Sequence, residues 1–183
     1  GILLLGGLGV GFTVYYLYKV GTQTSTTPTT DQTQSTANWK TYDNSRYGFS
    51  IKYPKTFTAT NSVNGDGVTL TSTSPAITIR TSGALNLDNQ SLDDYLNSVR
   101  ADLFSGVQSG EETYAHDTTL GGVSAQERRW QYVNSVDGTL TIEDQVTALK
   151  NGNFYTIDMV IGYSDYSQYA PMFDLVLQNF KFQ

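Results

Sequence analysis

The sequence predicts an α+β domain, an antiparallel β-sheet with helices packed on it, preceded by a single transmembrane helix. Three observations support this prediction: an apolar run at the start of the chain, short alternating runs bounded by turn residues, and two segments with apolar residues at helical spacing. They divide the chain into a transmembrane helix (1–20), a Thr/Ser/Gln-rich tether (21–38) and a folded extracytoplasmic domain (39–183).

The first segment carries no charge before Lys19 and is expected to cross a membrane, with membrane lipid as its partner. As a helix, residues 2–20 span roughly 28 Å, close to the thickness of one hydrocarbon core. Tyr15, Tyr16 and Tyr18 gather beside Lys19, where aromatic rings and an ammonium group prefer the headgroup layer. A secretory signal peptide is the alternative, but its apolar region is shorter and ends in a small-residue cleavage site.

Gly7 and Gly11 have the small-xxx-small spacing that lets two membrane helices approach closely. They are the predicted helix-packing residues in the membrane, for self-association or for another membrane protein. The alternative is that the span simply tolerates glycine.

The tether is too polar to form a core, with Pro28 and a single charge among its Thr, Ser and Gln residues. Stalks of this composition are common on the outer face of membranes, so the domain is expected on the extracytoplasmic side of the membrane. The formal net charge of −6 argues against a nucleic-acid partner. An acidic domain surface is also repelled by anionic lipid, so the helix alone is expected to attach the chain.

From Trp39 onward the pattern changes to short strands separated by turn residues, which predicts an antiparallel meander. The apolar positions of the first three runs are Phe49, Ile51 and Tyr53, then Val68 and Leu70, then Ile77 and Ile79. A second series of three strands follows Gly121-Gly122, with primed-turn hairpin signals at 136–139 and 150–153. In its last strand one face is better buried, that of Tyr155, Ile157, Met159 and Ile161.

Two helices are predicted from apolar residues at helical spacing. The first starts after Ser91, which forms a capping-box signal with Asp94, and carries Leu92, Tyr95, Leu96, Val99 and Leu103. The second has Pro171 in its first turn and closes the domain with Met172, Phe173, Val176, Leu177 and Phe180.

Several of these segments resemble a known family. The opening, Trp39-x-x-Tyr42-x-Asn44 followed by Tyr47-Gly-Phe-Ser-Ile-Lys-Tyr-Pro54, resembles that of the PsbP-like superfamily, as do Gly121-Gly-Val-Ser-Ala125 and the closing Asn179-Phe-Lys-Phe182. The resemblance covers nearly all of residues 39–183 and implies an α/β/α sandwich. The best-known members are extrinsic subunits of photosystem II, and relatives occur as surface domains of membrane-anchored prokaryotic proteins. It implies an accessory or binding role by analogy.

No set of residues predicts a catalytic site, a cofactor or a metal. The chain has no cysteine, which excludes disulfides, thiolate zinc sites and a cysteine nucleophile. His116, the single histidine, stands beside Asp117, but no nucleophile accompanies it, and a surface histidine is expected. The oxygen-rich segments 64–67 and Glu143-Asp144 lack the spacing of a calcium-binding loop, so turns are expected there.

Two further polar segments have local explanations. Asp93 and Asp94 occupy the first turn of the first helix, where carboxylates favour the positive end of its dipole. Asn89-Gln90-Ser91 is a glycosylation-type triplet.

The leading hypothesis is therefore a membrane-anchored, non-enzymatic cell-surface or complex-associated binding or accessory domain. The alternative is a pilin-like structural subunit of a cell-surface filament, assembled through the N-terminal apolar helix. An enzyme is the weakest of the three hypotheses, because no catalytic constellation is present.

Overall fold

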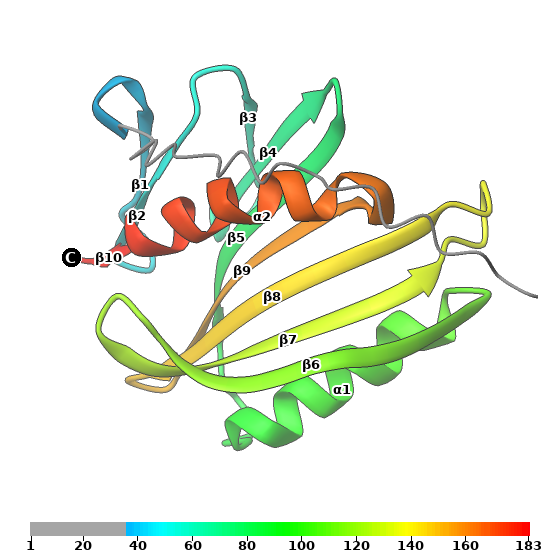
Figure 1. Cartoon of the computed structure of the whole chain (residues 1–183). Coiled ribbons are helices and arrows are strands. Elements are labelled where there is room, and N and C mark those ends of the chain that lie inside the picture. Colours follow the sequence, from blue (N-terminus) through cyan, green and yellow to red (C-terminus); the bar gives the residue numbers. More distant parts are fainter. Residues whose placement is uncertain (1–35) are drawn as a thin grey trace, which may run out of the picture. The chain divides into compact units, whose positions relative to one another are not determined.

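The computed structural model describes residues 36–183, which form two β-sheets and two α-helices (Figure 1). After a 3₁₀ turn, η1 (Thr36–Asn38), the elements are β1 (Lys40–Asn44), β2 (Phe49–Tyr53), β3 (Thr58–Asn61), β4 (Gly67–Thr73), β5 (Ala76–Leu85), α1 (Leu92–Ser105), β6 (Ser109–Leu120), β7 (Val123–Val133), β8 (Leu140–Lys150), β9 (Asn153–Gly162), α2 (Tyr163–Gln178) and β10 (Lys181–Phe182).

The larger sheet has seven antiparallel strands in the order β3-β4-β5-β9-β8-β7-β6. The predicted hairpin between β8 and β9 is confirmed: Asn151 and Gly152 both have positive φ, as a type I′ turn requires. The hairpin predicted at 136–139 is also present, between β7 and β8, but its connection is not a primed two-residue turn. Six residues, 134–139, connect β7 to β8, and within 136–139 only Gly138 has a positive φ.

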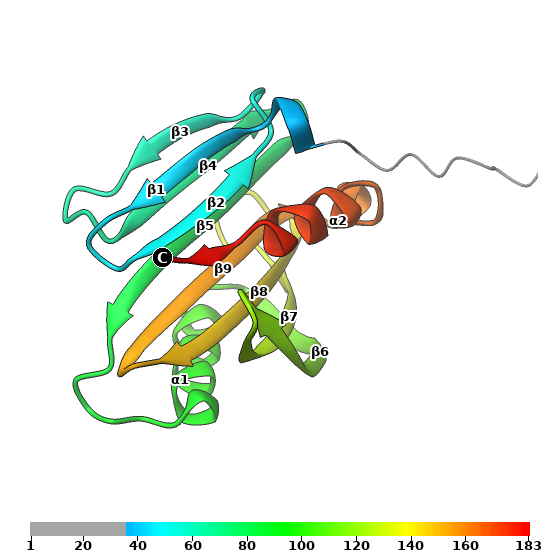
Figure 2. The same ribbon diagram turned by 90° about the vertical axis from the view of Figure 1, so that its left-hand side faces the viewer.

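The smaller sheet, of order β1-β2-β10, differs from the predicted meander (Figure 2). β2 pairs with β1 and with the C-terminal β10 instead of with β4. Strands β1, β3 and β6 were not predicted from the sequence, because their residues do not alternate between apolar and polar. β6, for example, is an edge strand with Leu120 as its single buried residue.

The first helix starts as predicted, since Ser91 Oγ accepts the backbone N–H of Asp94 at 3.1 Å. The closing helix does not start near Pro171. It begins at Tyr163, so that Pro171 lies exposed within the helix. The polar run 163–169 hides this start from an apolar pattern, and buried Met172, Phe173 and Val176 hold the helix on the sheet.

The two helices cover opposite faces of the larger sheet (Figure 1). On the α1 face, Tyr95 stacks on Phe154 of β9 with ring centroids 3.9 Å apart. On the α2 face, Tyr155, Ile157, Met159 and Ile161 join the main core, which also takes in α2 and the smaller sheet. The better-buried face of β9 is thus the predicted one. The described residues contain this whole core and form a single compact unit.

The predicted transmembrane helix with Gly7 and Gly11, and the tether up to residue 35, lie outside the described residues. Within 36–183 neither α1 nor α2 has the length and apolar character needed to cross a membrane.

Candidate binding cleft beside helix α2

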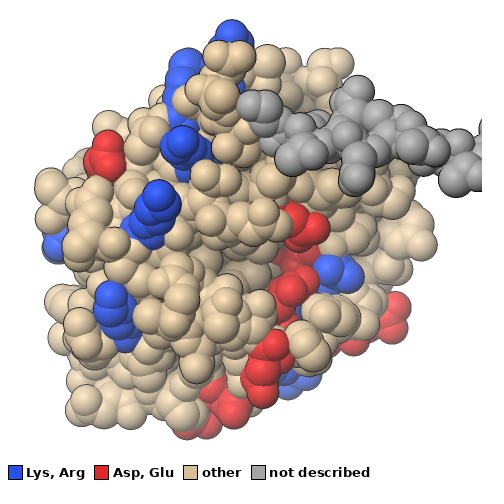
Figure 3. Space-filling model, turned by 60° about the vertical axis from the view of Figure 1, so that its left-hand side comes forward, with Lys and Arg blue, Asp and Glu red and all other residues tan. Residues whose placement is uncertain are grey.

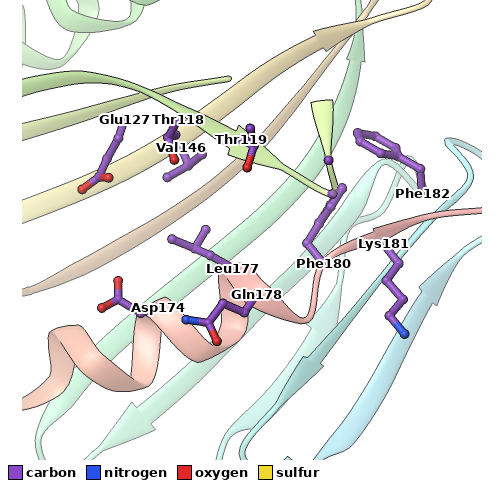
Figure 4. A pocket seen from close by; sticks show the side chains of 12 residues that line it. Thr118, Thr119, Glu127, Val146, Asp174, Leu177, Gln178, Phe180, Lys181 and Phe182 are labelled. Atoms are coloured by element: carbon purple, nitrogen blue, oxygen red, sulfur yellow. The ribbon is translucent and has the colours of Figure 1, made fainter. Parts of the chain in front are cut away.

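A cleft of about 670 Å³ lies where the second half of α2 and the C-terminal strand meet the β6–β7 hairpin (Figure 4). Its walls combine two carboxylates, two threonine hydroxyls, an amide and an aromatic floor. The lining residues are Thr118, Thr119, Gly121, Gly122, Glu127, Val146, Asp174, Leu177, Gln178, Phe180, Lys181 and Phe182.

Strand and helix periodicity place the carboxylates. Asp174, Leu177 and Gln178 follow each other at i, i+3 and i+4 on α2 and therefore share one side of the helix. Figure 4 shows Glu127 of β7 and Asp174 of α2 pointing toward each other across the cleft, while Lys181 points away. The cleft thus presents two acidic groups that face one another.

The turn between β6 and β7, which forms one end of the cleft, requires glycine. Gly121 and Gly122 have φ values of +56° and +81°, which L side chains rarely adopt. A Cβ on Gly121 would also come within 2.9 Å of the Phe182 ring. The two glycines let this turn rest against the aromatic floor, a role beyond the strand entry predicted from the sequence.

A partly buried charge cluster, centred on the buried Asp144, adjoins the carboxylates. Arg129 donates hydrogen bonds to Asp144 at 2.9 and 3.1 Å and to Glu127 at 3.0 Å. Its guanidinium lies between two tyrosine rings, 4.7 Å from the centroid of Tyr114 and 4.8 Å from that of Tyr166. Tyr166 also donates its hydroxyl to Asp144.

This cluster leaves the cleft negative. Arg129 is one cation among the carboxylates of Glu127, Asp144 and Asp174. Burial raises the pKa of Glu127, and the neighbouring Asp144 raises it further. Asp174 is exposed on α2, but its partial desolvation in the cleft and then Asp144 likewise raise its pKa, against the pull of Arg129. A cation between the Glu127 and Asp174 carboxylates would be favoured, because it would relieve the repulsion among the negative charges.

A second ion network, with buried carboxylates and a half-exposed arginine, occupies the α1 face of the sheet. Arg80 of β5 donates to Asp158 at 2.8 Å and to Glu143 at 3.2 Å, and Tyr132 donates to the other Glu143 oxygen at 3.4 Å. Burial raises the pKa of Asp158 to about 7, although Arg80 opposes the shift. Arg80 already neutralises this network in part, so we favour the α2 cleft as the site of function.

The structure separates the polar pairs that the sequence places side by side. Glu143 and Asp144 are buried on opposite faces of β8, each with its own arginine. His116 is exposed on β6, and Asp117 points to the other face of the strand, so it does not orient the imidazole. Across 36–183, no group of three or more His, Asp or Glu side chains is arranged to hold a metal ion.

The remaining candidate segments have structural roles. Residues 64–67 form the predicted turn: the side chain of Asn64 donates to Asp66 at 2.6 Å, and a hydrogen bond from Ser62 lowers the pKa of Asp66. Asp93 pairs with Arg128 at 3.1 Å and ties α1 to β7. Asn89 is exposed in the loop before α1, with a φ of +50°.

Glu127 and Asp174 were not among the site residues predicted from the sequence. One signal was available, since Arg128-Arg129 is the only adjacent basic pair and sits in an otherwise alternating strand. Asp174 follows the apolar pair Met172-Phe173 and looks like an ordinary exposed helix position. Only the packing of α2 on β8 and β9, beside β7 in the sheet, brings these groups together.

Comparison with solved structures gives clear matches at low sequence identity. The cyanobacterial PsbP protein CyanoP from Synechocystis sp. PCC 6803 matches with a TM-score of 0.59 and 14% identity, over 79% of this chain and 92% of that one. The domain has the PsbP-like fold. The Ran-binding protein Mog1p from Saccharomyces cerevisiae shares it with a TM-score of 0.58 and 9% identity, over 79% of this chain and 95% of that one.

LpqN of Mycobacterium tuberculosis, described as involved in cell envelope biogenesis, also shares the PsbP-like fold. It matches with a TM-score of 0.54 and 12% identity, over 78% of this chain and 89% of its own. No protein-family model matches the sequence, and no curated protein matches it. The fold expected from the family resemblance is confirmed, and identities this low carry no activity or partner with them.

Proposed function

We propose that the chain is a membrane-tethered, extracytoplasmic, non-enzymatic binding domain that uses its acidic cleft to hold a cationic side chain of a partner protein. The observation that carries the proposal is the opposition of Glu127 and Asp174 across a cleft with an aromatic floor. An ammonium or guanidinium group would sit between the carboxylates, and its aliphatic stem would lie on Leu177 and Phe180.

The comparisons support a binding role by analogy only. One protein of this fold is a Ran-binding protein, and another is a PsbP protein. The membrane tether and the extracytoplasmic location come from the composition of residues 1–38.

A photo-cross-linking residue at Gln178, which is exposed and lines the cleft, tests this proposal in the full chain in its native membranes. We expect a discrete cross-linked protein, lost when Glu127→Gln and Asp174→Asn are combined. The same cross-linker at Ser98, exposed on α1, is the matched control and should give no such product. The role of the cleft would be contradicted if both positions gave the same amount of cross-linked product. It would also be contradicted if the product from Gln178 persisted in the variant that lacks both carboxylates.

The filament hypothesis remains the alternative for the N-terminal helix. It predicts fibres on the surface of the producing cells, which electron micrographs of intact cells would reveal, and cross-links from Gln178 to further copies of the same chain. A hydrolase screen with a clean positive result would instead revive the enzyme hypothesis.

A further inference from the structure

The charge of this acidic chain is unevenly distributed. Within residues 36–183 the ion pairs are made by three arginines, Arg80, Arg128 and Arg129, and no lysine takes part in one. Residues 36–60 hold four basic residues and a single acidic one, Asp43. Figure 3 shows Lys and Arg side chains gathered over one side of the molecule, with a band of Asp and Glu on the other.

Three of these four basic residues are lysines on or directly after the paired strands β1 and β2, near the point where the chain enters the domain. Lys40 directly follows Trp39, and β1 pairs Lys40 with Tyr53 and Thr41 with Lys52. Lys55 comes two residues after Tyr53, between Pro54 and Thr56. Lys40 and Lys55 are exposed, and Lys52 is half-buried. We call Lys40, Lys52 and Lys55 the entry lysines.

An aromatic groove of about 590 Å³ lies at this end of the domain, and its lining residues Trp39, Pro54 and Thr56 are the chain neighbours of Lys40 and Lys55. Its lining is Trp39, Pro54, Thr56, Phe57, Gln168, Tyr169, Pro171 and Met172, without a charged side chain. Trp39 and Tyr169 are both partly exposed against the core. Tryptophan and tyrosine beside lysine is the combination that membrane–water interfaces enrich, because the rings reach the headgroup layer while ammonium groups meet anionic lipid.

From this juxtaposition we propose that the end of the domain formed by the entry lysines and the Trp39 groove docks on an anionic lipid surface. The inference rests on the proposed membrane tether, which would deliver this end of the domain to the bilayer. It revises the expectation that an acidic domain is repelled by lipid, since that expectation assumed evenly spread charge. The acidic cleft, on the other side of α2, would then remain free for a partner.

Acidic residues near the docking end are few. Asp43 lies further along β1, and its carboxylate accepts the side-chain amide of Gln183 at 3.0 Å. Asp165, one turn before Tyr169 on α2, is turned back toward Gly162. Neither lines the groove.

Residues 36–183 contain their own core, so the isolated domain is a suitable probe. We would measure its co-sedimentation with vesicles of pure phosphatidylcholine and with vesicles in which about one third of the lipid is phosphatidylserine, at low salt. Binding is expected only to the second. Changing the three entry lysines to Gln together should weaken it on the order of a hundred-fold, at about five-fold for each lysine.

The matched control removes three other cations: Arg46→Gln, Arg100→Gln and Lys150→Gln. It changes the net charge equally and should retain most of the binding. A second readout uses Trp39, since the only other tryptophan, Trp130, is fully buried and cannot contact lipid. Its emission should shift to shorter wavelength when the anionic vesicles bind.

Equal loss in both triple variants, no binding to anionic vesicles, or an unchanged Trp39 emission would overturn the proposal. In that case an acidic protein surface would be the next binding partner to test for the entry lysines. Carbonate extraction of the full chain from membranes tests the tether separately. If the full chain resists extraction but the isolated domain does not bind vesicles, the docking inference is wrong and the proposed tether still stands.

Discussion

The guanidinium of Arg129 lies 4.8 Å from the ring centroid of Tyr166, and both residues donate a hydrogen bond to the same oxygen of Asp144. Asp144 thus joins β7, β8 and α2 through one buried carboxylate. The interaction also positions one carboxylate of the acidic cleft, because Arg129 holds Glu127 through the same guanidinium. The stability of the domain and the geometry of the cleft are therefore linked through Asp144.

Replacing Asp144 should destabilise the domain strongly. Asp144→Asn removes the charge that pairs with Arg129, and breaking a buried ion pair from one side typically costs about 3 kcal/mol or more. Urea unfolding followed by circular dichroism measures this cost. Glu127→Gln is the control: burial already raises the pKa of Glu127, so its loss of charge should cost far less. Equal costs for the two variants would show that the buried pair is not the link between the elements.

Asp158 should make stability depend on pH. Burial raises its pKa from 3.8 to about 7 in the folded protein, so between those values unfolding releases a proton. The contribution of Asp158 to the unfolding free energy therefore falls as pH rises, by up to about 1.4 kcal/mol per unit. Denaturation at several pH values should show this slope in the wild type and a shallower one in Asp158→Asn. Parallel slopes would place the pKa of Asp158 near its usual value.

Gly67 cannot accept a side chain. A Cβ there would lie 1.9 Å from the backbone oxygen of Thr81 in the paired strand, and backbone cannot move aside as a side chain can. Gly67→Ala should lower the unfolding free energy by about 3 kcal/mol or more. Gly106 is the matched control, since its φ is −100° and its Cβ would meet only ordinary contact at 3.7 Å. Gly106→Ala should be neutral or slightly stabilising. Similar melting temperatures for both variants would contradict the close approach of β4 to β5.

The N-cap of α1 should contribute measurably to stability. Ser91→Ala removes the acceptor for the Asp94 N–H and should cost about 1 kcal/mol in chemical denaturation. Ser98→Ala, an exposed position within the same helix, should be neutral or stabilising, because Ala favours the helix interior. A cost at Ser98 equal to that at Ser91 would argue against the cap.

Local signals predicted what depends on a few neighbouring residues. Ser91 and Asp94 located the start of α1, and Asn151-Gly152 located a hairpin, because capping and primed turns act within two or three positions. The alternation in β9 separated its two faces correctly. The signals failed where a polar run hid the start of α2 at Tyr163 and where the edge strand β6 lacked an apolar face.

The fold class of the domain, the positions of its most regular elements and the absence of cysteine chemistry could all be predicted from the sequence, since periodicity and composition are properties of short windows. Where the charges meet depends on the assembled fold. Arg80 and Asp158 are 78 residues apart, and Glu127 faces Asp174 because α2 packs on β8 and β9, beside β7. Such pairings follow from strand register and from helix packing between distant parts of the chain. The acidic cleft and the Trp39 groove beside the entry lysines therefore form only when the sheets are assembled.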